Sequence, residues 1–295
     1  MAGRRIRMLS AMQFTRLSGF NSIPSVTGGI ARLACARLDE MGKDPTIILS
    51  KVGLTPEEAR DPAVRLEVRT QIKLLELAAE EVHDEWLGFH LARSFDLREI
   101  GLVYYVIASS DQLSDALRSA ERYSQINNEG VRLRFSMQDG AAVIALDYVN
   151  VDRDADRHQI EFWLVTLVRI CRQVTNGRLV PSRLKTKHLR NRTPAEFRAF
   201  FGVDIEFGAN ADEIWFPRPI ALLSLVGRDE RLNELLRRYA ERRWRANLTP
   251  KAKAGGSNDQ ISDQVCDVGN VTDGTDRCAL VHARFCDGRG RWRPC

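Results

Sequence analysis

The sequence predicts an α+β fold with a mainly helical N-terminal half, a β-hairpin and small sheet, a long central helix and a closing C-terminal helix. Three observations lead to this prediction. Apolar residues recur every three or four positions through the first part of the chain, which is the spacing of one helix face. The spacing changes to strict alternation across residues 131–148, as in paired strands. Further strands then stand among helices without a regular βαβ repeat, which argues against a doubly wound sheet.

Three helices are predicted first. The first spans Ile30 to Met41 and is stopped by Gly42, because glycine readily adopts the left-handed conformation that follows a helix end. The second spans residues 68–82 with apolar residues on one face. A short third helix follows over residues 87–91.

A break at residues 96–100 separates these helices from two more. Residues 102–108 are apolar on nearly all sides, which predicts a buried helix. Ser110 is a suitable N-cap for the next helix, whose inner face runs from Leu113 to Tyr123.

The alternating segments predict a β-hairpin. Residues 131–137 and 144–148 each alternate between apolar and polar side chains. Asp139-Gly140 lies between them and suits a type I′ turn, because both central residues of that turn need positive φ.

The long central helix is predicted from the apolar stripe over residues 160–174. Either Asp152 or Asp154 can cap its first turn, and Asn176-Gly177 ends it.

The remainder of the domain is predicted to be a few short strands and two helices. Residues 184–189, 203–207 and 213–216 are the expected strands. Thr193-Pro194-Ala195-Glu196 has the pattern of a capping box and predicts a short helix to Phe201. The closing helix spans residues 228–245, and its predicted inward face is Leu232, Leu235, Leu236 and Tyr239.

The helical pattern ends near Pro250. Residues 251–295 contain one leucine, six glycines and four of the six cysteines. We therefore expect a flexible basic arm over residues 1–25, a folded domain over residues 26–246, and a linker with a disordered tail over residues 247–295.

The net charge of +5 is not concentrated on the predicted domain. Residues 1–25 carry four arginines and no acidic residue, whereas residues 26–250 carry equal numbers of basic and acidic residues. One cluster stands out inside the domain, formed by Arg237, Arg238, Arg242, Arg243 and Arg245. We interpret it as a solvated helix end, with phosphate binding as the alternative.

Several classes of protein are disfavoured by what the sequence lacks. No apolar run is long enough to span a membrane, and the N-terminus lacks the apolar core of a secretory signal, so we expect a cytoplasmic protein. Cys278, His282 and Cys286 have helical spacing for a metal, but the spacing matches no common zinc module. We expect no metal, no cofactor and no enzymatic activity, because no nucleophile elbow, phosphate loop or zinc-hydrolase motif occurs.

Four aromatic residues are the candidate contacts for a bound small molecule: Tyr104, Tyr105, Tyr123 and Trp163. Each lies on an apolar helix face, and a buried tyrosine or tryptophan needs a partner for its polar atom. That partner is usually a protein group, and the alternative is a ligand in an apolar pocket.

Two stretches carry a resemblance to a known family. They are DLREIGLVYYVIASSDQLSDALRSAERYSQIN (96–127) and RTPAEFRAFFGVDIEFGANADEIWFPRPIALLSL (192–225). With the segment between them, they resemble the N-terminal effector-binding domain of AraC-type transcription regulators, in the subgroup with an arabinose-binding-like domain. The resemblance covers about residues 28–244. It implies a domain that binds a small organic effector, that often contributes to a homodimer, and that controls a C-terminal domain with two helix-turn-helix units.

The end of the chain departs from that family. ISDQV (261–265) resembles the start of a first DNA-binding helix, but no helical pattern follows it. The closing RFCDGRGRWRPC is typical of a GC-rich gene read in a shifted frame, which translation of the other two frames would test. We therefore expect a truncated regulator, weak or inactive in DNA binding, and assign no DNA-binding residues. The alternative is a stand-alone small-molecule-binding or dimerisation module that acts on intact relatives.

Overall fold

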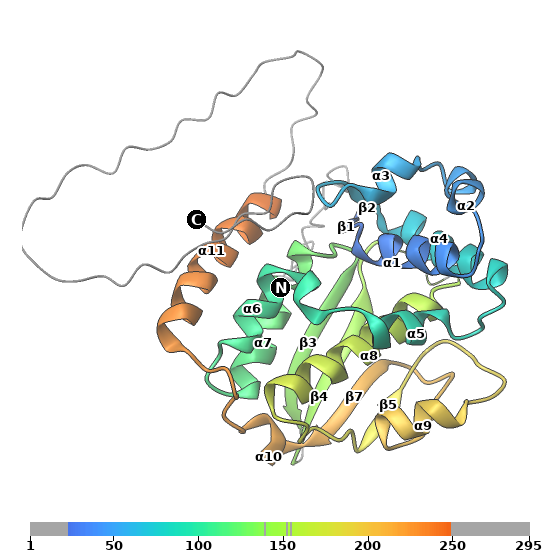
Figure 1. Ribbon diagram of the computed structural model, residues 1–295. Helices are drawn as coiled ribbons and strands as arrows, with labels where there is room; N and C mark the ends of the chain where they lie inside the picture. Colours follow the sequence, from blue (N-terminus) through green and yellow to red (C-terminus); the bar gives the residue numbers. More distant parts are fainter. Residues whose placement is uncertain (1–22, 139, 152, 154, 249–295) are drawn as a thin grey trace, which may run out of the picture. The chain divides into compact units, whose positions relative to one another are not determined.

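The computed structural model describes residues 23–138, 140–151, 153 and 155–248 (Figure 1). The predicted α+β class is confirmed, because many helices surround a five-stranded sheet. Most of the expected arm and tail, and the Cys278–Cys286 segment, lie outside the described residues. Within the part that is described, no helix has the length and apolar character needed to span a membrane.

The N-terminal segment folds into four helices and a two-stranded ribbon. The elements are β1 (Ser25–Thr27), α1 (Gly29–Glu40), α2 (Pro45–Lys51), α3 (Pro56–Arg60), β2 (Arg65–Glu67) and α4 (Val68–Glu81). Helices α2 and α3 were not predicted, although both have clear start signals. The side chain of Asp44 accepts a hydrogen bond from the backbone N–H of Thr46, and Thr55 forms a reciprocal capping box with Glu58.

A second group of helices follows: α5 (Leu87–Ser94), η1 (Leu97–Ile100), α6 (Leu102–Ala108), α7 (Leu113–Tyr123) and η2 (Ser124–Ile126). The expected cap at Ser110 is not formed, because Gln112 occupies the N-cap position of α7. The Ser110 hydroxyl instead donates to the carbonyl oxygen of Val106, 2.8 Å away, and so closes the end of α6.

The sheet has the strand order β3-β4-β7-β5-β6. Its strands are β3 (Val131–Gln138), β4 (Ala141–Tyr148), β5 (Arg183–Lys185), β6 (Ile205–Glu206) and β7 (Asp212–Pro217). The predicted hairpin is confirmed, with Val131 opposite Tyr148 and Gln138 opposite Ala141. Gly140 in its turn has φ +82°, a conformation that glycine adopts without strain.

Helix α8 (Arg157–Val174) is the predicted central helix, and it lies across the sheet beside α5 (Figure 1). Asp156 is at its N-cap position, while the two aspartates expected to cap it lie outside the described residues. The approach of α5 depends on Gly88, because a Cβ atom there would lie 1.9 Å from the carbonyl oxygen of His158.

The last helices are α9 (Ala195–Phe201), α10 (Arg218–Ala221) and α11 (Glu230–Leu248). The capping box expected at Thr193 is wrong, because Pro194 is the N-cap of α9 and no side chain caps it. Gly202 ends α9 in the left-handed conformation, directly after Phe201, where the sequence predicts the end of the helix.

The predicted inward face of α11 is wrong at three of its four residues. Leu232, Leu235 and Tyr239 are 45%, 57% and 45% exposed, respectively. The helix instead faces the domain with Ala240, which is fully buried. The small side chain of Ala240 lets the backbone of α11 approach the domain closely. The apolar stripe in the sequence predicts an apolar helix face, but it does not show which face the domain covers.

Candidate functional site

A narrow apolar cavity lies between α6, α7, η2, the β3–β4 hairpin and α8. Its volume is about 50 Å³. Apolar side chains form most of the wall, including Ile107 of α6, Ala120 of α7, Leu133 of β3 and Ile170 of α8. Three helices and both strands of the hairpin therefore contribute to one small space.

Four polar atoms of residues that line this cavity have no hydrogen-bond partner within the described residues. They are Ser124 Oγ, Asn128 Nδ2, Trp163 Nε1 and Thr166 Oγ1. Asn128 is 2% exposed and Thr166 is fully buried. Leaving such a buried polar atom unpaired costs about 1–3 kcal/mol, but these atoms are enclosed by protein atoms, and the surface of the cavity itself is apolar.

A second cavity of about 50 Å³ adjoins the first. The two share Ile100, Asn127 and Trp163, so the indole of Trp163 borders both. Glu99 lines the second cavity and is exposed, which places a carboxylate on its solvent side.

Of the four residues that the sequence suggested as ligand contacts, Trp163 lines both cavities and the three tyrosines line neither. Tyr104 is buried, and its hydroxyl accepts a hydrogen bond from Gln173 Nε2 at 2.6 Å. Burial raises the pKa of Tyr104. Tyr105 is 45% exposed. Which of the four touches a ligand stays a prediction.

Tyr123 has a different role in the geometry of the site. Its hydroxyl donates to Glu241 Oε2 of α11 at 3.2 Å, and Arg122 donates to the same carboxylate through Nε and Nη2, both at 2.8 Å. The hydrogen bond from Arg122 lowers the pKa of Glu241 to about 2. The carboxylate is therefore ionised at neutral pH and holds α11 to the end of α7.

A second contact holds α11 to α6. Asn233 Nδ2 donates to the carbonyl oxygen of Val106 at 2.8 Å and to Ser109 Oγ at 3.0 Å. Helices α6 and α7 and the turn η2 form walls of the cavity. The contacts of Glu241 and Asn233 therefore connect α11 to the cavity wall. Figure 1 shows α11 alongside α6 and α7. None of this was predicted, because Glu241 and Arg122 lie 119 positions apart and no local pattern relates them.

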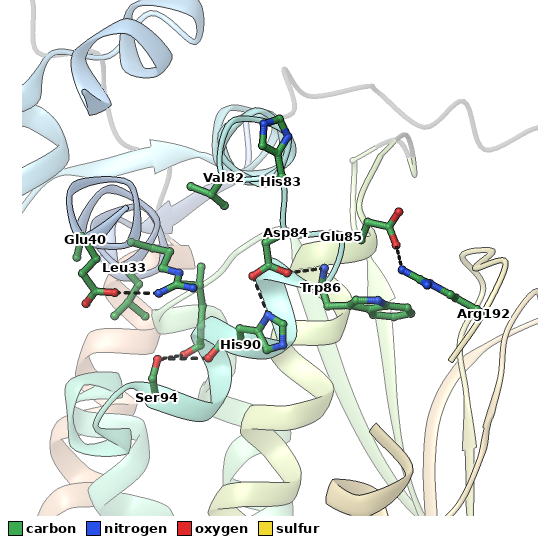
Figure 2. Close-up of a pocket in the computed structure, with 13 residues that line it drawn as sticks. Leu33, Glu40, Val82, His83, Asp84, Glu85, Trp86, His90, Ser94 and Arg192 are labelled. Carbon is green, nitrogen blue, oxygen red and sulfur yellow. Dashed lines mark hydrogen bonds and ion pairs between the residues drawn. The ribbon is translucent and has the colours of Figure 1, made fainter. Parts of the chain in front are cut away.

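A larger open groove of about 820 Å³ lies between α1, the α4–α5 turn and α5 (Figure 2). His90 Nδ1 lies 2.7 Å from Asp84 Oδ2, and Glu85 pairs with Arg192 at 3.2 Å. His90 Nε2 lies 3.0 Å from Glu196 Oε1, and the hydrogen bond to Asp84 raises the pKa of His90. Because these charges are matched within the protein, the groove calls for no charged ligand.

Comparisons with known proteins identify the family of this domain. The family model described as the arabinose-binding domain of AraC transcription regulators, N-terminal, matches residues 42–225. The crystal structure of the transcriptional regulator CdpR from Pseudomonas aeruginosa is similar in fold, with a TM-score of 0.52 and 12% sequence identity. The similarity covers 70% of this chain and 63% of CdpR, so it spans less than two thirds of that structure. No curated protein matches.

Proposed function

Because the chain belongs to the AraC-type transcription regulators with an arabinose-binding-like N-terminal domain, we propose that this domain senses a small organic effector in the cavity between α6, α7, α8 and the hairpin. One observation carries the proposal: an apolar cavity of the domain has walls that hydrogen bonds fasten to α11. We propose a cytoplasmic regulator rather than an enzyme, with no cofactor.

The size of the cavity suggests how binding is transmitted. Pockets for drug-sized ligands are about 300–1,000 Å³, which is several times larger than this cavity. An effector of that size must therefore move α6, α7 or η2 outward. Helix α11 follows, because Asn233 and Glu241 fix it to those elements. The effector acts by binding the widened state more tightly than the narrow one.

A cavity-filling variant tests this proposal. Ile170→Trp fills the cavity at a typical cost of about 1–3 kcal/mol in stability, which a stable domain tolerates. In a thermal-shift screen of neutral and charged metabolites, we expect compounds that raise the Tm of the wild type but not that of Ile170→Trp. Val180→Trp, at a 52% exposed position outside the cavity, is the control and keeps the response. Equal shifts in wild type and Ile170→Trp contradict the proposal.

The proposal includes weak DNA binding by this chain. Residues 251–295 contain one leucine, and so few large apolar side chains do not offset the entropy lost on ordering a helix-turn-helix pair. Gel-shift titration with the DNA upstream of the gene is the measurement. A sequence-specific complex that withstands physiological salt would contradict this part of the proposal.

A second candidate function is a dimerisation module that acts on intact relatives, and the outward face of α11 favours it. Leu232, Leu235 and Tyr239 are exposed there, and exposed apolar clusters with tyrosine are typical of protein interfaces. We expect sedimentation velocity to show a dimer for the wild type and a monomer for Leu235→Glu. Val180→Glu is the matched control at an exposed position elsewhere and remains dimeric. A monomeric wild type at high protein concentration contradicts this candidate.

A further inference from the structure

We propose that the C-terminal half of α11 binds the phosphate backbone of duplex DNA without regard to base sequence. The contact surface is an exposed group of five arginines, called here the arginine surface: Arg237, Arg238, Arg242, Arg243 and Arg245. This inference rests on the proposed function and adds a partner surface outside the effector cavity. It is compatible with weak DNA binding by the chain, because backbone contacts need no helix-turn-helix unit.

The first argument is the uneven charge of α11. Residues 230–236 carry two glutamates and one arginine, a net charge of −1, whereas residues 237–248 carry five arginines and one glutamate, a net charge of +4. The one glutamate, Glu241, already accepts hydrogen bonds from Arg122 of α7 and from Arg245. A sixth arginine therefore lies at the same surface, and the positive charge there exceeds the negative charge on this half of the helix.

The second argument is that the fold explains few of these arginines. Cations stabilise a helix mainly within its last turn, and the last turn of α11 contains Arg245 but none of the other four. Arg238 and Arg242 are four residues apart, and like charges at that spacing destabilise a helix. Within the described part of the chain, no ion pair joins Arg237, Arg242 or Arg243 to an acidic side chain. An anionic partner would account for the arginines that the helix dipole does not.

The third argument is the placement of the arginines. Arg238, Arg242 and Arg245 are spaced by four and three residues and so lie on one face of α11. The buried Ala240 lies on the opposite side of the helix, so this face points away from the domain. The face is about 10 Å long, and that length of duplex DNA carries about six phosphates. Arginine binds phosphate oxygens through paired hydrogen bonds, so a row of phosphates is the complementary partner.

Lipid headgroups are another anionic surface, and the apolar residues of α11 argue against them. A helix that lies on a membrane inserts large apolar side chains next to its basic ones. The exposed Leu232 and Leu235 lie outside the arginine-rich half, and among residues 237–246 only Tyr239 is a large apolar side chain that is exposed. Trp244 is packed against the core of the domain. DNA fits better, because binding its backbone needs no inserted side chain.

Fluorescence anisotropy of a labelled duplex tests the proposal with the full chain. The duplex has about 20 base pairs of scrambled sequence, which is long enough to cover the arginine surface. We expect a Kd of about 1–100 µM near physiological salt, and a logarithm of affinity that falls linearly with the logarithm of the salt concentration. A duplex with the sequence upstream of the gene should bind within about twofold of the scrambled one, because phosphate contacts do not read bases.

The double variant Arg238→Gln/Arg242→Gln removes two charges from the outward face of α11. Each lost phosphate contact lowers the steepness of the salt dependence by about one, so we expect a slope that is smaller by about two and an affinity about tenfold weaker at about 50 mM salt. Arg178→Gln/Arg183→Gln is the matched control. It also removes two exposed arginines, of which Arg183 forms an exposed ion pair with Glu206, and it should keep the slope within about 0.5 of the wild type. Both variants should keep the wild-type Tm within about 2 °C, because all four positions are exposed.

Three results would overturn this inference. The first is a duplex affinity of Arg238→Gln/Arg242→Gln equal to that of the wild type, because the contacts would then lie elsewhere in the chain. The second is an equal loss in both double variants, because net charge alone would then govern binding. The third is binding to vesicles of phosphatidylserine and phosphatidylcholine without binding to the duplex, because the partner would then be a membrane.

These outcomes are separate from those of the proposed function. A complex specific for the upstream duplex contradicts the weak DNA binding proposed above, while the salt slope of Arg238→Gln/Arg242→Gln still decides whether α11 contacts phosphates. The thermal-shift comparison of wild type and Ile170→Trp decides whether the cavity senses an effector, whatever the duplex shows.

Discussion

The contact between α5 and α8 is a close helix crossing, and Gly88→Ala tests it. A Cβ atom at residue 88 would lie 1.9 Å from the carbonyl oxygen of His158, whereas ordinary contacts begin near 3.4 Å. That oxygen belongs to the backbone of α8, so no side-chain rotation relieves the overlap. The two helices must therefore separate by about 1.5 Å.

The expected loss follows from that separation. A gap of 0.5–1 Å already removes roughly a quarter to a half of the dispersion energy of each contact across an interface. The fully buried Leu87 and Phe89 of α5 are among the side chains affected. We expect Gly88→Ala to lower the free energy of unfolding by about 3 kcal/mol. For a domain of this size, that corresponds to a fall in Tm of about 6–12 °C.

Urea unfolding followed by circular dichroism measures this change. Gly29→Ala is the matched control, because the nearest atom to its Cβ would be the flexible Arg32 Nη2 at 3.8 Å. The control should stay within about 0.5 kcal/mol of the wild type or gain slightly, since alanine favours helix more than glycine does. A Gly88→Ala protein as stable as this control would refute the argument for the close crossing.

Two further predictions concern charged groups. The pKa of His90 is raised, mainly by its hydrogen bond to Asp84. The protonated ring therefore stabilises the folded state fully below pH 6.5, and this stabilisation is lost as the pH rises through the raised pKa. His90→Gln should therefore lose most stability below pH 6.5 and approach the wild type once the pH exceeds the raised pKa, as measured by urea unfolding across pH. Glu161→Gln should cost about 3–5 kcal/mol, because the buried carboxylate of Glu161 accepts two hydrogen bonds at 2.8 Å from the guanidinium of Arg190, which is also buried. Glu206→Gln, in an exposed ion pair, should cost at most about 1 kcal/mol in the same assay.

Local patterns in the sequence were enough to predict most of the elements. The alternation from Val131 to Met137 and the glycine at residue 140 gave the hairpin, because strand pairing across a two-residue turn is a local property. The stripe over residues 160–174 gave the central helix for the same reason. The helix caps were harder to predict. The hydroxyl of Ser110, for example, donates to the nearby carbonyl oxygen of Val106 instead of capping the next helix.

Features that depend on distant segments were not predictable in this way. The stripe on α11 identified an apolar face, but only the position of α6 and α7 decides that Ala240 is covered and Leu235 is exposed. The cavity could not be predicted from the sequence for the same reason. Trp163 was found as an aromatic residue on an apolar face, whereas only the packing of distant segments brings residues such as Leu133 and Ile170 to the same cavity.

The apolar wall of the cavity can supply enough free energy for the proposed switch. Burial of apolar surface is worth about 25 cal/mol per Å², so about 100 Å² of additional burial is worth about 2.5 kcal/mol. Coupling free energies between distant protein sites are typically about 1–3 kcal/mol. A ligand that buries about that much more apolar surface in the widened cavity than in the narrow one therefore gains enough to favour the widened state. Since Glu241 and Asn233 hold α11 to two walls of that cavity, the same free energy is available to reposition the helix that leads into the rest of the chain.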